Sequence, residues 1–313
     1  MRLVMDERLR ASGLLLLAAG IWGFAFVAQR AGMEHVGPLL FNGIRFLLGV
    51  LVLLPFLLHR RGAQRQRDAL RRRADAPSRP LDRRTLIGLL AAGLVLTLAA
   101  NLQQIGLVST TAGKAGFLTG LYVVLVPLLG FLRGQRIRRA MALAVPMSAA
   151  GLYLLSVTGP FHVAAGDAWI LLGAVVWAVH VQLIDWLVGR VDAVVIAIVQ
   201  FSVCGVLSLA ASFATESTSL AGLTAASGAI AYAGVLSVGV AYTLQVVGQR
   251  RVEPSRAGVV LSLEGVFAAL GGWIVLGEHL SGRALVGCGL MLAAMILAQF
   301  GQSARRQDAS VRP

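Results

Sequence analysis

Residues 114–139 read KAGFLTGLYVVLVPLLGFLRGQRIRR, and a second stretch, 256–283, repeats their pattern as RAGVVLSLEGVFAALGGWIVLGEHLSGR. Each copy begins with a cation followed by Ala-Gly, and continues through about twenty mostly apolar residues. Each copy then reads Gly-Gln-Arg-Ile or Gly-Glu-His-Leu before another apolar run begins. An apolar run of this length is long enough to span a bilayer. The pattern therefore predicts a membrane protein built from two similar halves.

The repeat extends upstream of these two stretches. Gln103 and Gln245 each lie 11 residues before the cation that opens their copy. Both halves also begin with an apolar run centred on a tryptophan, LLLAAGIWGF at Trp22 and LLGAVVWAVH at Trp177. Equivalent positions in the two halves are therefore expected to have related places in the fold.

The composition indicates that lipid surrounds most of the chain. Hydrophobic residues make up 57% of it and charged residues 13%, with a mean hydropathy of +0.78. This leaves too little polar surface to cover a water-soluble globule. The formal charge is +14, but 27 of the 28 cations are arginine and most lie in short gaps between apolar runs. This distribution is typical of membrane topology, so no nucleic acid partner is expected.

Ten apolar segments predict an all-α integral membrane protein with ten transmembrane helices. They lie near 12–32, 37–58, 85–108, 112–132, 140–157, 167–187, 193–214, 222–248, 257–276 and 284–300. Five helices fall in a first repeat, 12–157, and five in a second, 167–300. Because five is odd, the two repeats are expected to enter the membrane in opposite directions, as in the inverted repeats of secondary transporters. Residues 301–313 are expected to form a cytoplasmic tail.

The arginine distribution predicts the orientation. If the N-terminus is cytoplasmic, 24 basic residues lie on the cytoplasmic side, while Arg30, Lys114 and Arg283 lie outside. The positive-inside rule then places both termini in the cytoplasm. Ten of the arginines lie in the linker 59–84, which has no apolar periodicity. We expect this linker to be a solvated or lipid-surface cytoplasmic loop attracted to anionic headgroups.

Ionisable residues inside the apolar segments mark a candidate solute pathway, because each costs at least about 2.5–3.5 kcal/mol to insert. Arg45, Glu264 and His180 meet this condition. Arg45 is expected to meet an anionic group, either of the solute or of Glu264, and Glu264 is expected to carry protons as the coupling ion. The alternative for these two residues is a static structural ion pair. His180 could equally be a neutral buried side chain.

Uncharged polar and aromatic side chains complete the predicted pathway. Gln103 and Gln245 occupy equivalent repeat positions at mirrored depths, so they are expected to line one central cavity from opposite sides. Trp22 and Trp177 are also equivalent, and both fall near mid-membrane rather than in the interfacial belt where tryptophan is common. Some polar side chains could instead only join helices. The remaining candidates are Asn101, Tyr122 and Tyr242.

Missing motifs narrow the function further. Ala follows Gly113-Lys114, so the chain has no P-loop, and it has neither H-E-x-x-H nor G-x-S-x-G. We therefore expect no ATP-driven pump, no enzyme and no cofactor. The alternative to a secondary transporter is a non-transporting polytopic membrane protein, such as a lipid-handling enzyme or an assembly factor. That alternative calls for interfacial catalytic carboxylates or a large extramembrane surface, and neither is visible in the sequence.

Several short motifs in order resemble one family across residues 12–300. They are W-G-F at 22–24, N-G-I-R-F at 42–46, AGKAGFLTGLYVVLVPLLG at 112–130, and AGVVLSLEGVFAALG at 257–271 followed by L-G-E at 276–278. Together they resemble the EamA-type permeases of the drug/metabolite transporter superfamily. Two positions depart from that family's usual pattern. Gly265 follows Glu264 where the family usually has proline, and Gln135 follows Gly134 where glutamate is common.

The resemblance implies ten helices in two inverted five-helix repeats around a central cavity, in a bacterial plasma membrane. It also implies the export of a small organic metabolite, such as an amino acid or a drug-like solute. The identity of the solute and the oligomeric state stay open at this point, because members of one fold carry chemically different solutes.

Overall fold

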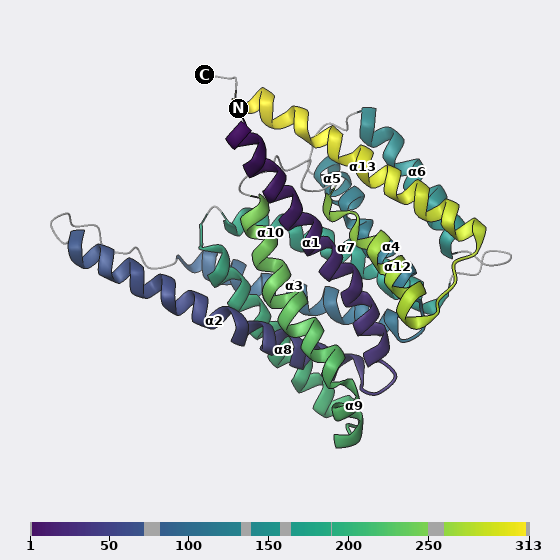
Figure 1. Cartoon of the computed structure of the whole chain (residues 1–313), viewed down its shortest axis with the longest axis horizontal. Coiled ribbons are helices and arrows are strands. Elements are labelled where there is room, and N and C mark those ends of the chain that lie inside the picture. The colour runs from purple at the N-terminus through teal and green to yellow at the C-terminus, as the bar shows by residue number, and fades with distance from the viewer. Residues whose placement is uncertain are drawn as a thin grey trace.

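The computed structural model describes residues 2–71, 82–132, 139–156, 164–188, 190–249 and 260–310. Over these ranges the chain is helical and contains no β-strand (Figure 1). The elements are α1 (Arg2–Gly32), α2 (Pro38–Arg71), α3 (Arg83–Leu107), α4 (Ala112–Gly120), α5 (Tyr122–Leu132), α6 (Arg139–Ser156), α7 (Ala165–Val188), α8 (Ala193–Thr215), α9 (Leu220–Ala231), the π-helix η1 (Tyr232–Ala241), α10 (Tyr242–Gln249), α12 (Glu264–Leu276) and α13 (Gly282–Ser310).

Six helical stretches are long and apolar enough to cross a membrane. They are Arg10–Gly32, Pro38–His59, Arg83–Leu107, Ala165–Val188, Ala193–Thr215 and Leu220–Gln245. Four shorter apolar helical stretches accompany them, Ala112–Val126, Ala142–Leu155, Glu264–Leu276 and Gly282–Leu297. Each of the ten predicted segments falls on one of these stretches. The chain is therefore an all-α, multi-pass membrane protein.

The linker 59–84 differs from its prediction as a loop. α2 continues as a helix to Arg71 and extends well beyond the rest of the bundle in Figure 1, while residues 72–81 lie outside the described part of the chain. The sequence HRRGAQRQRDALR contains five Arg, two Gln and two Ala, which are strong helix formers even without an apolar face. The same reason applies to the predicted tail, where α13 continues to Ser310.

Two segments that were predicted as single helices are interrupted. The first is broken at Leu121, between α4 and α5, and the second in a turn at Ser262 and Leu263, just before α12. In each break a leucine N–H donates to a carbonyl three residues earlier, Leu121 to Leu118 at 3.3 Å and Leu263 to Val260 at 3.2 Å. Leu121 and Leu263 follow their opening cations at the same distance, so the two breaks occupy equivalent positions in the repeats.

A third interruption is the π-helix η1, which separates α9 from α10. π-Helical turns are rare and occur frequently at functional sites. Two hydrogen bonds join η1 to α1. The indole N–H of Trp22 in α1 donates to the carbonyl of Ser237 at 3.0 Å, and the hydroxyl of Tyr232 in η1 donates to the carbonyl of Ile21 at 3.1 Å. These contacts hold η1 against α1.

Helices from the two halves alternate through the bundle. The principal neighbours are α6 with α13, α3 with α7, α2 with α8, α4 with α12, α1 with α12, α3 with α8 and α2 with η1, and α1 also lies along α9, η1 and α10. Large apolar side chains remain exposed on the outward faces of several helices, among them Leu51, Leu94, Val206 and Trp273. Such faces suit contact with lipid.

Small residues allow the closest helix approaches. A Cβ added to Gly23 would lie 2.3 Å from the Cβ of Phe267, and one added to Gly116 would lie 2.6 Å from the Cβ of Ala268. α1 and α4 therefore both reach within backbone contact of α12. Gly120 also allows a close approach, because a Cβ there would lie 3.0 Å from the sulfur of Met295 in α13.

Side chains cap the beginnings of several helices. Asp82 accepts a hydrogen bond from the backbone N–H of Thr85 at 3.0 Å, and Thr111 does so from Lys114 at 3.2 Å. The hydrogen bonds from Thr85 lower the pKa of Asp82, so this carboxylate stays ionised at the positive end of the α3 dipole. These caps satisfy backbone donors that the helices leave unpaired.

Candidate functional site

Arg45 lies at the centre of a buried polar network on three helices. Its Nε donates to Oδ1 of Asn42 at 2.8 Å, and Nδ2 of Asn42 donates to Oδ1 of Asn101 at 2.7 Å and to the carbonyl of Ala100 at 2.9 Å. Asn101 in turn donates to Ser208 of α8 at 2.9 Å. The chain of contacts links α2, α3 and α8, so the side chains hold one another in position.

Aromatic rings surround the Arg45 guanidinium. Its Cζ lies 4.8 Å from the ring centre of Phe46 and 6.0 Å from that of Phe41, distances at which a cation is attracted to the ring face. The ring of Phe46 lies 5.6 Å from that of Phe201, which lies 5.7 Å from Tyr242. Arg45 is 4% exposed, and among the described residues it forms no ion pair with a carboxylate. The positive charge of Arg45 is therefore stabilised by the amide of Asn42 and by aromatic rings.

A second polar network joins α1, α3 and α7. The indole N–H of Trp177 donates to Oε1 of Gln103 at 3.1 Å, and Nε2 of Gln103 lies 3.3 Å from Oε1 of Gln29. Gln104 donates to the carbonyl of Gln29 at 3.4 Å and lies 3.3 Å from the sulfur of Met33. Its own Oε1 is buried and has no partner in the described structure. This amide could accept a hydrogen bond from a solute or from water.

His180 joins this network through its contact with Trp177. The two rings are 5.4 Å apart in an edge-to-face arrangement, and Nε2 of His180 lies 2.8 Å from Oε1 of Gln200 in α8. The imidazole is 6% exposed. His180 is thus a buried side chain that joins α7 to α8, and its place in a solute pathway stays a prediction.

Glu264 and Tyr122 form a third cluster at the two helix breaks. Each is the first residue of the helix after its break, and the two lie close enough to interact electrostatically. Glu264 is 7% exposed, and no described residue forms a hydrogen bond or ion pair with its carboxylate. Its position at the first turn of α12 places the carboxylate at the positive end of a helix dipole. Arg45 and Glu264 therefore belong to separate clusters and are not paired.

The predicted residues are thus only partly brought together. Arg45 and Asn101 share one network, Gln103, Trp177 and His180 share another, and Tyr122 lies within electrostatic range of Glu264. Tyr242 reaches the first network through Phe201, whereas Trp22 contacts η1, and Gln245 is half-buried and joins neither network within the described residues.

Sequence reasoning missed Asn42, Gln29 and Ser208 as members of the networks. Asn42 precedes Arg45 by three residues, so both lie on the same face of α2, and this spacing was an available signal. Gln29 lies close to the predicted end of its apolar segment, where a polar side chain is expected at the membrane–water interface. Ser208 carries no such signal, because buried serines commonly bond to their own helix.

An open pocket of about 380 Å³ lies at one end of the bundle. It is lined by Arg30, Glu34, Ser109, Thr110, Thr111, Lys114, Ala164, Leu276 and Glu278. Arg30 follows Gln29 directly in α1, and Thr110 lies six residues after Gln104. The pocket therefore lies within about two helical turns of the second polar network. Among the described residues, no group of His, Cys, Asp and Glu side chains is arranged to hold a metal ion.

Comparisons with known proteins agree with this architecture. The EamA-like transporter family matches the chain twice, over residues 9–157 and 164–300. An uncharacterized transporter of Archaeoglobus fulgidus is 30% identical over 93% of this chain and 86% of its own length. The uncharacterized inner membrane transporter YedA of Escherichia coli K12 is 28% identical over 93% of this chain and 90% of its own.

A solved crystal structure shares the fold. It superposes with a TM-score of 0.62 at 21% sequence identity, and covers 95% of this chain and 99% of its own. The relatives carry transporter names and no enzyme name, which agrees with the expectation that this chain is not an enzyme. Because the family matches nearly the whole chain, and does so once in each half, the protein belongs to the EamA-like transporter family.

Proposed function

We propose that the protein is a secondary active transporter that exports a small organic metabolite by alternating access between its two halves. The observation that carries the proposal is the pair of helix breaks at Leu121 and Leu263. Discontinuous helices at corresponding repeat positions are the best pointer to a transporter's binding site, because broken helices expose backbone groups and helix ends to the solute. Here the breaks are followed directly by Tyr122 and Glu264.

The proposed membrane arrangement has ten crossings in two inverted repeats. The six long and four short apolar stretches supply the ten crossings. Helix packing supports the inverted repeat. When each helix is replaced by its equivalent in the other half, the observed pairs of neighbouring helices correspond to other observed pairs. The packing of α3 on α7 corresponds to that of α1 on α9, η1 and α10, and the packing of α3 on α8 corresponds to that of α2 on η1. The exchange leaves three pairs unchanged, because each joins two equivalent helices: α2 with α8, α4 with α12, and α6 with α13.

The proposed location is a bacterial inner membrane, with both termini in the cytoplasm. The excess of arginine on one side supports this orientation, and the relative YedA is named an inner membrane transporter. The end of α2 beyond His59 would then project from the cytoplasmic surface. Its arginine-rich sequence suits attraction to anionic headgroups.

Arg45 suits recognition of a solute that carries an anionic group such as a carboxylate. A buried guanidinium has several donors, whereas the described contacts of Arg45 use Nε alone for a hydrogen bond. A carboxylate could bind the two remaining guanidinium nitrogens and neutralise the charge. Phe41, Phe46 and Phe201 would provide an apolar surface for the rest of the solute.

Glu264 suits the coupling of transport to protons. Without a cationic partner, a buried carboxylate gains from protonation, and it loses the proton when a conformational change exposes it to water. The static ion pair with Arg45, considered from sequence, does not apply in this conformation. Glu264 and Tyr122 begin the helices that follow the breaks, so a change at the breaks would alter the surroundings of the carboxylate.

Proton flux in proteoliposomes tests this proposal and identifies a solute in the same experiment. Vesicles loaded with a pH-sensitive dye would be challenged with a panel of amino acids, nucleosides and their toxic analogues. We expect at least one solute to change the internal pH, and Glu264→Gln to abolish that change while solute exchange persists. Glu34→Gln, which removes an exposed carboxylate, is the matched control and should retain proton flux. Undiminished solute-driven proton flux in Glu264→Gln would rule out the coupling role.

A further inference from the structure

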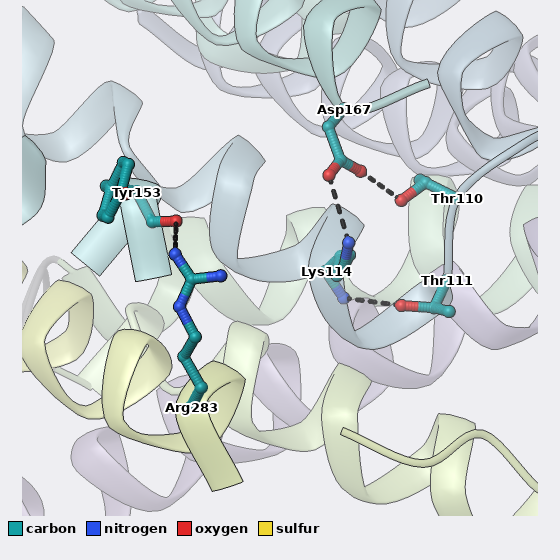
Figure 2. Close-up of polar contacts among 6 residues, drawn as sticks. All are labelled: Thr110, Thr111, Lys114, Tyr153, Asp167 and Arg283. Atoms are coloured by element: carbon teal, nitrogen blue, oxygen red, sulfur yellow. Dashed lines mark hydrogen bonds and ion pairs between the residues drawn. The ribbon is translucent and has the colours of Figure 1, made fainter. Parts of the chain in front are cut away.

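Polar contacts between the two halves gather at the end of the bundle that holds the open pocket. In Figure 2, the ammonium of Lys114 and the hydroxyl of Thr110 both point to the carboxylate of Asp167. Lys114 Nζ is 3.2 Å from Oδ2 of Asp167, and Thr110 donates to Oδ1. Lys114 and Thr110 come from the first half, whereas Asp167 begins α7 in the second. Asp167 is 1% exposed, so the ion pair is largely shielded from water.

Glu278 makes a second connection between the halves. This glutamate follows α12, and its carboxylate accepts hydrogen bonds from the backbone N–H groups of Ala112 at 2.8 Å and Gly113 at 3.2 Å. A side chain of the second half thus caps the first turn of α4 in the first half. A Cβ on Gly272 would lie 2.3 Å from Oε2 of Glu278, so the carboxylate rests directly on that glycine.

Glu216 repeats this arrangement on another helix. It follows α8, and its two carboxylate oxygens accept from the N–H groups of Leu39 and Leu40 at 2.9 Å each, at the beginning of α2. Gly37 leaves room for the carboxylate, since a Cβ there would lie 2.2 Å from Cδ of Glu216. Arg283 adds a fourth connection, because its guanidinium donates to the carbonyl of Tyr153 at 3.2 Å (Figure 2).

We propose that these contacts form a polar clamp, made by Asp167, Glu216 and Glu278 with their partners, that closes this mouth of the transporter and opens during each cycle. Thr110, Lys114 and Glu278 of the clamp line the open pocket, and Asp167 contacts the first two of them. Beneath the clamp, Ile170 of α7 is fully buried, and a Cβ on Gly106 of α3 would lie 2.4 Å from Cγ1 of Ile170. This contact packs α3 directly against α7 below the clamp.

The chemistry of the clamp suits a reversible closure. Each carboxylate binds backbone N–H groups or an ammonium, and water can replace these polar partners when the halves separate. An apolar seal of the same area would expose hydrocarbon to water on opening and would resist it. Thr110, Lys114 and Glu278, which line the pocket, therefore supply hydrogen bonds to the closed mouth and polar surface to the open one.

Cysteine accessibility tests the clamp directly, whatever the solute is. Ile170→Cys would be introduced into the full chain with Cys204→Ala and Cys288→Ala, and the purified protein in detergent would be reacted with a water-soluble maleimide. We expect slow labelling that becomes at least about tenfold faster with Asp167→Asn, Glu216→Gln or Glu278→Gln, the factor that corresponds to losing one charge-assisted hydrogen bond. Three separate contacts are changed, so one variant that fails to fold leaves two others.

Glu34→Gln is the matched control, because Glu34 lines the same pocket but pairs with Arg30 of its own half at 3.8 Å. We expect it to leave labelling unchanged, which excludes an effect of surface charge on the reagent. Thermal unfolding of each variant would be measured in parallel. If folded clamp variants label no faster than the parent, the contacts only stabilise the fold and the proposal is wrong. Fast labelling of the unaltered parent would overturn it as well. Neither result depends on proton coupling at Glu264, so this test and the flux test can fail separately.

Discussion

At the scale of single residues, Asn42 determines the surroundings of Arg45. An amide has one acceptor oxygen and two donor hydrogens, and Asn42 uses its oxygen for Arg45 and its nitrogen for Asn101 and the carbonyl of Ala100. The side chain is fully buried, so water cannot replace any of these partners in the described conformation. Asn42 therefore positions the guanidinium that we propose binds the solute.

Replacing Asn42 with alanine removes three hydrogen bonds from this network, and the buried Nε of Arg45 loses its only described hydrogen-bond acceptor. We expect Asn42→Ala to lower the free energy of unfolding by about 1–3 kcal/mol and to weaken solute-driven flux, because Arg45 loses its orientation. Thr243→Ala is a suitable control, since Thr243 donates only to the carbonyl of Gly239 in its own helical turn. Denaturant or thermal unfolding of the purified proteins provides the measurement. Equal stability of the two variants would show that the network contributes little.

At the scale of secondary-structure elements, the approach of α4 to α12 depends on glycine. Gly116 faces Ala268 so closely that a methyl group at its Cβ would overlap the neighbouring helix. Gly265 makes the same approach from the other side, since its Cα lies 3.2 Å from the Cβ position of Gly116. These two glycines bring the helix breaks together, and with them Tyr122 and Glu264.

A single methyl group should separate these helices. Gly116→Ala is expected to lower stability by about 1–3 kcal/mol, the range found when a packed core is overfilled. Gly228→Ala adds the same methyl group in α9 with nothing within 4 Å, and is expected to leave stability unchanged or raise it slightly. The difference between their unfolding midpoints is the measurement. A Gly116→Ala protein as stable as Gly228→Ala would contradict the close packing of α4 on α12.

At the scale of the whole molecule, the orientation in the membrane can be tested at two positions. Ser78 lies outside the described residues in the arginine-rich linker, and Ser217 is exposed in the turn after α8. In intact bacterial cells, an impermeant thiol reagent should label Ser217→Cys and should fail to label Ser78→Cys until the cells are opened. Labelling of Ser78→Cys in intact cells would reverse the orientation, and the polar clamp would then lie on the cytoplasmic side.

Local sequence was sufficient for the helices and their repeat. The ten apolar runs predicted where the helical stretches lie, because lipid requires each spanning segment to satisfy its own backbone. The repeat was visible from the recurring cation with Ala-Gly and from the glutamine 11 residues before each cation. The same reasoning failed at the end of α2, where helix propensity continues the helix to Arg71 without an apolar face. It also placed no break at Leu121 or Leu263, because the glycines beside them, Gly120 and Gly265, are common inside membrane helices.

The sequence by itself determined the class of protein, the two halves and the buried ionisable residues, since composition and periodicity decide how a chain partitions into lipid. Tertiary structure alone decided which of these residues meet. It separated Arg45 from Glu264, placed Asn42 and Gln29 in the networks, and joined Lys114 to Asp167 across the halves. Such contacts depend on how helices far apart in sequence rotate and pack, and a polar side chain at a helix end carries no local signal of its distant partner.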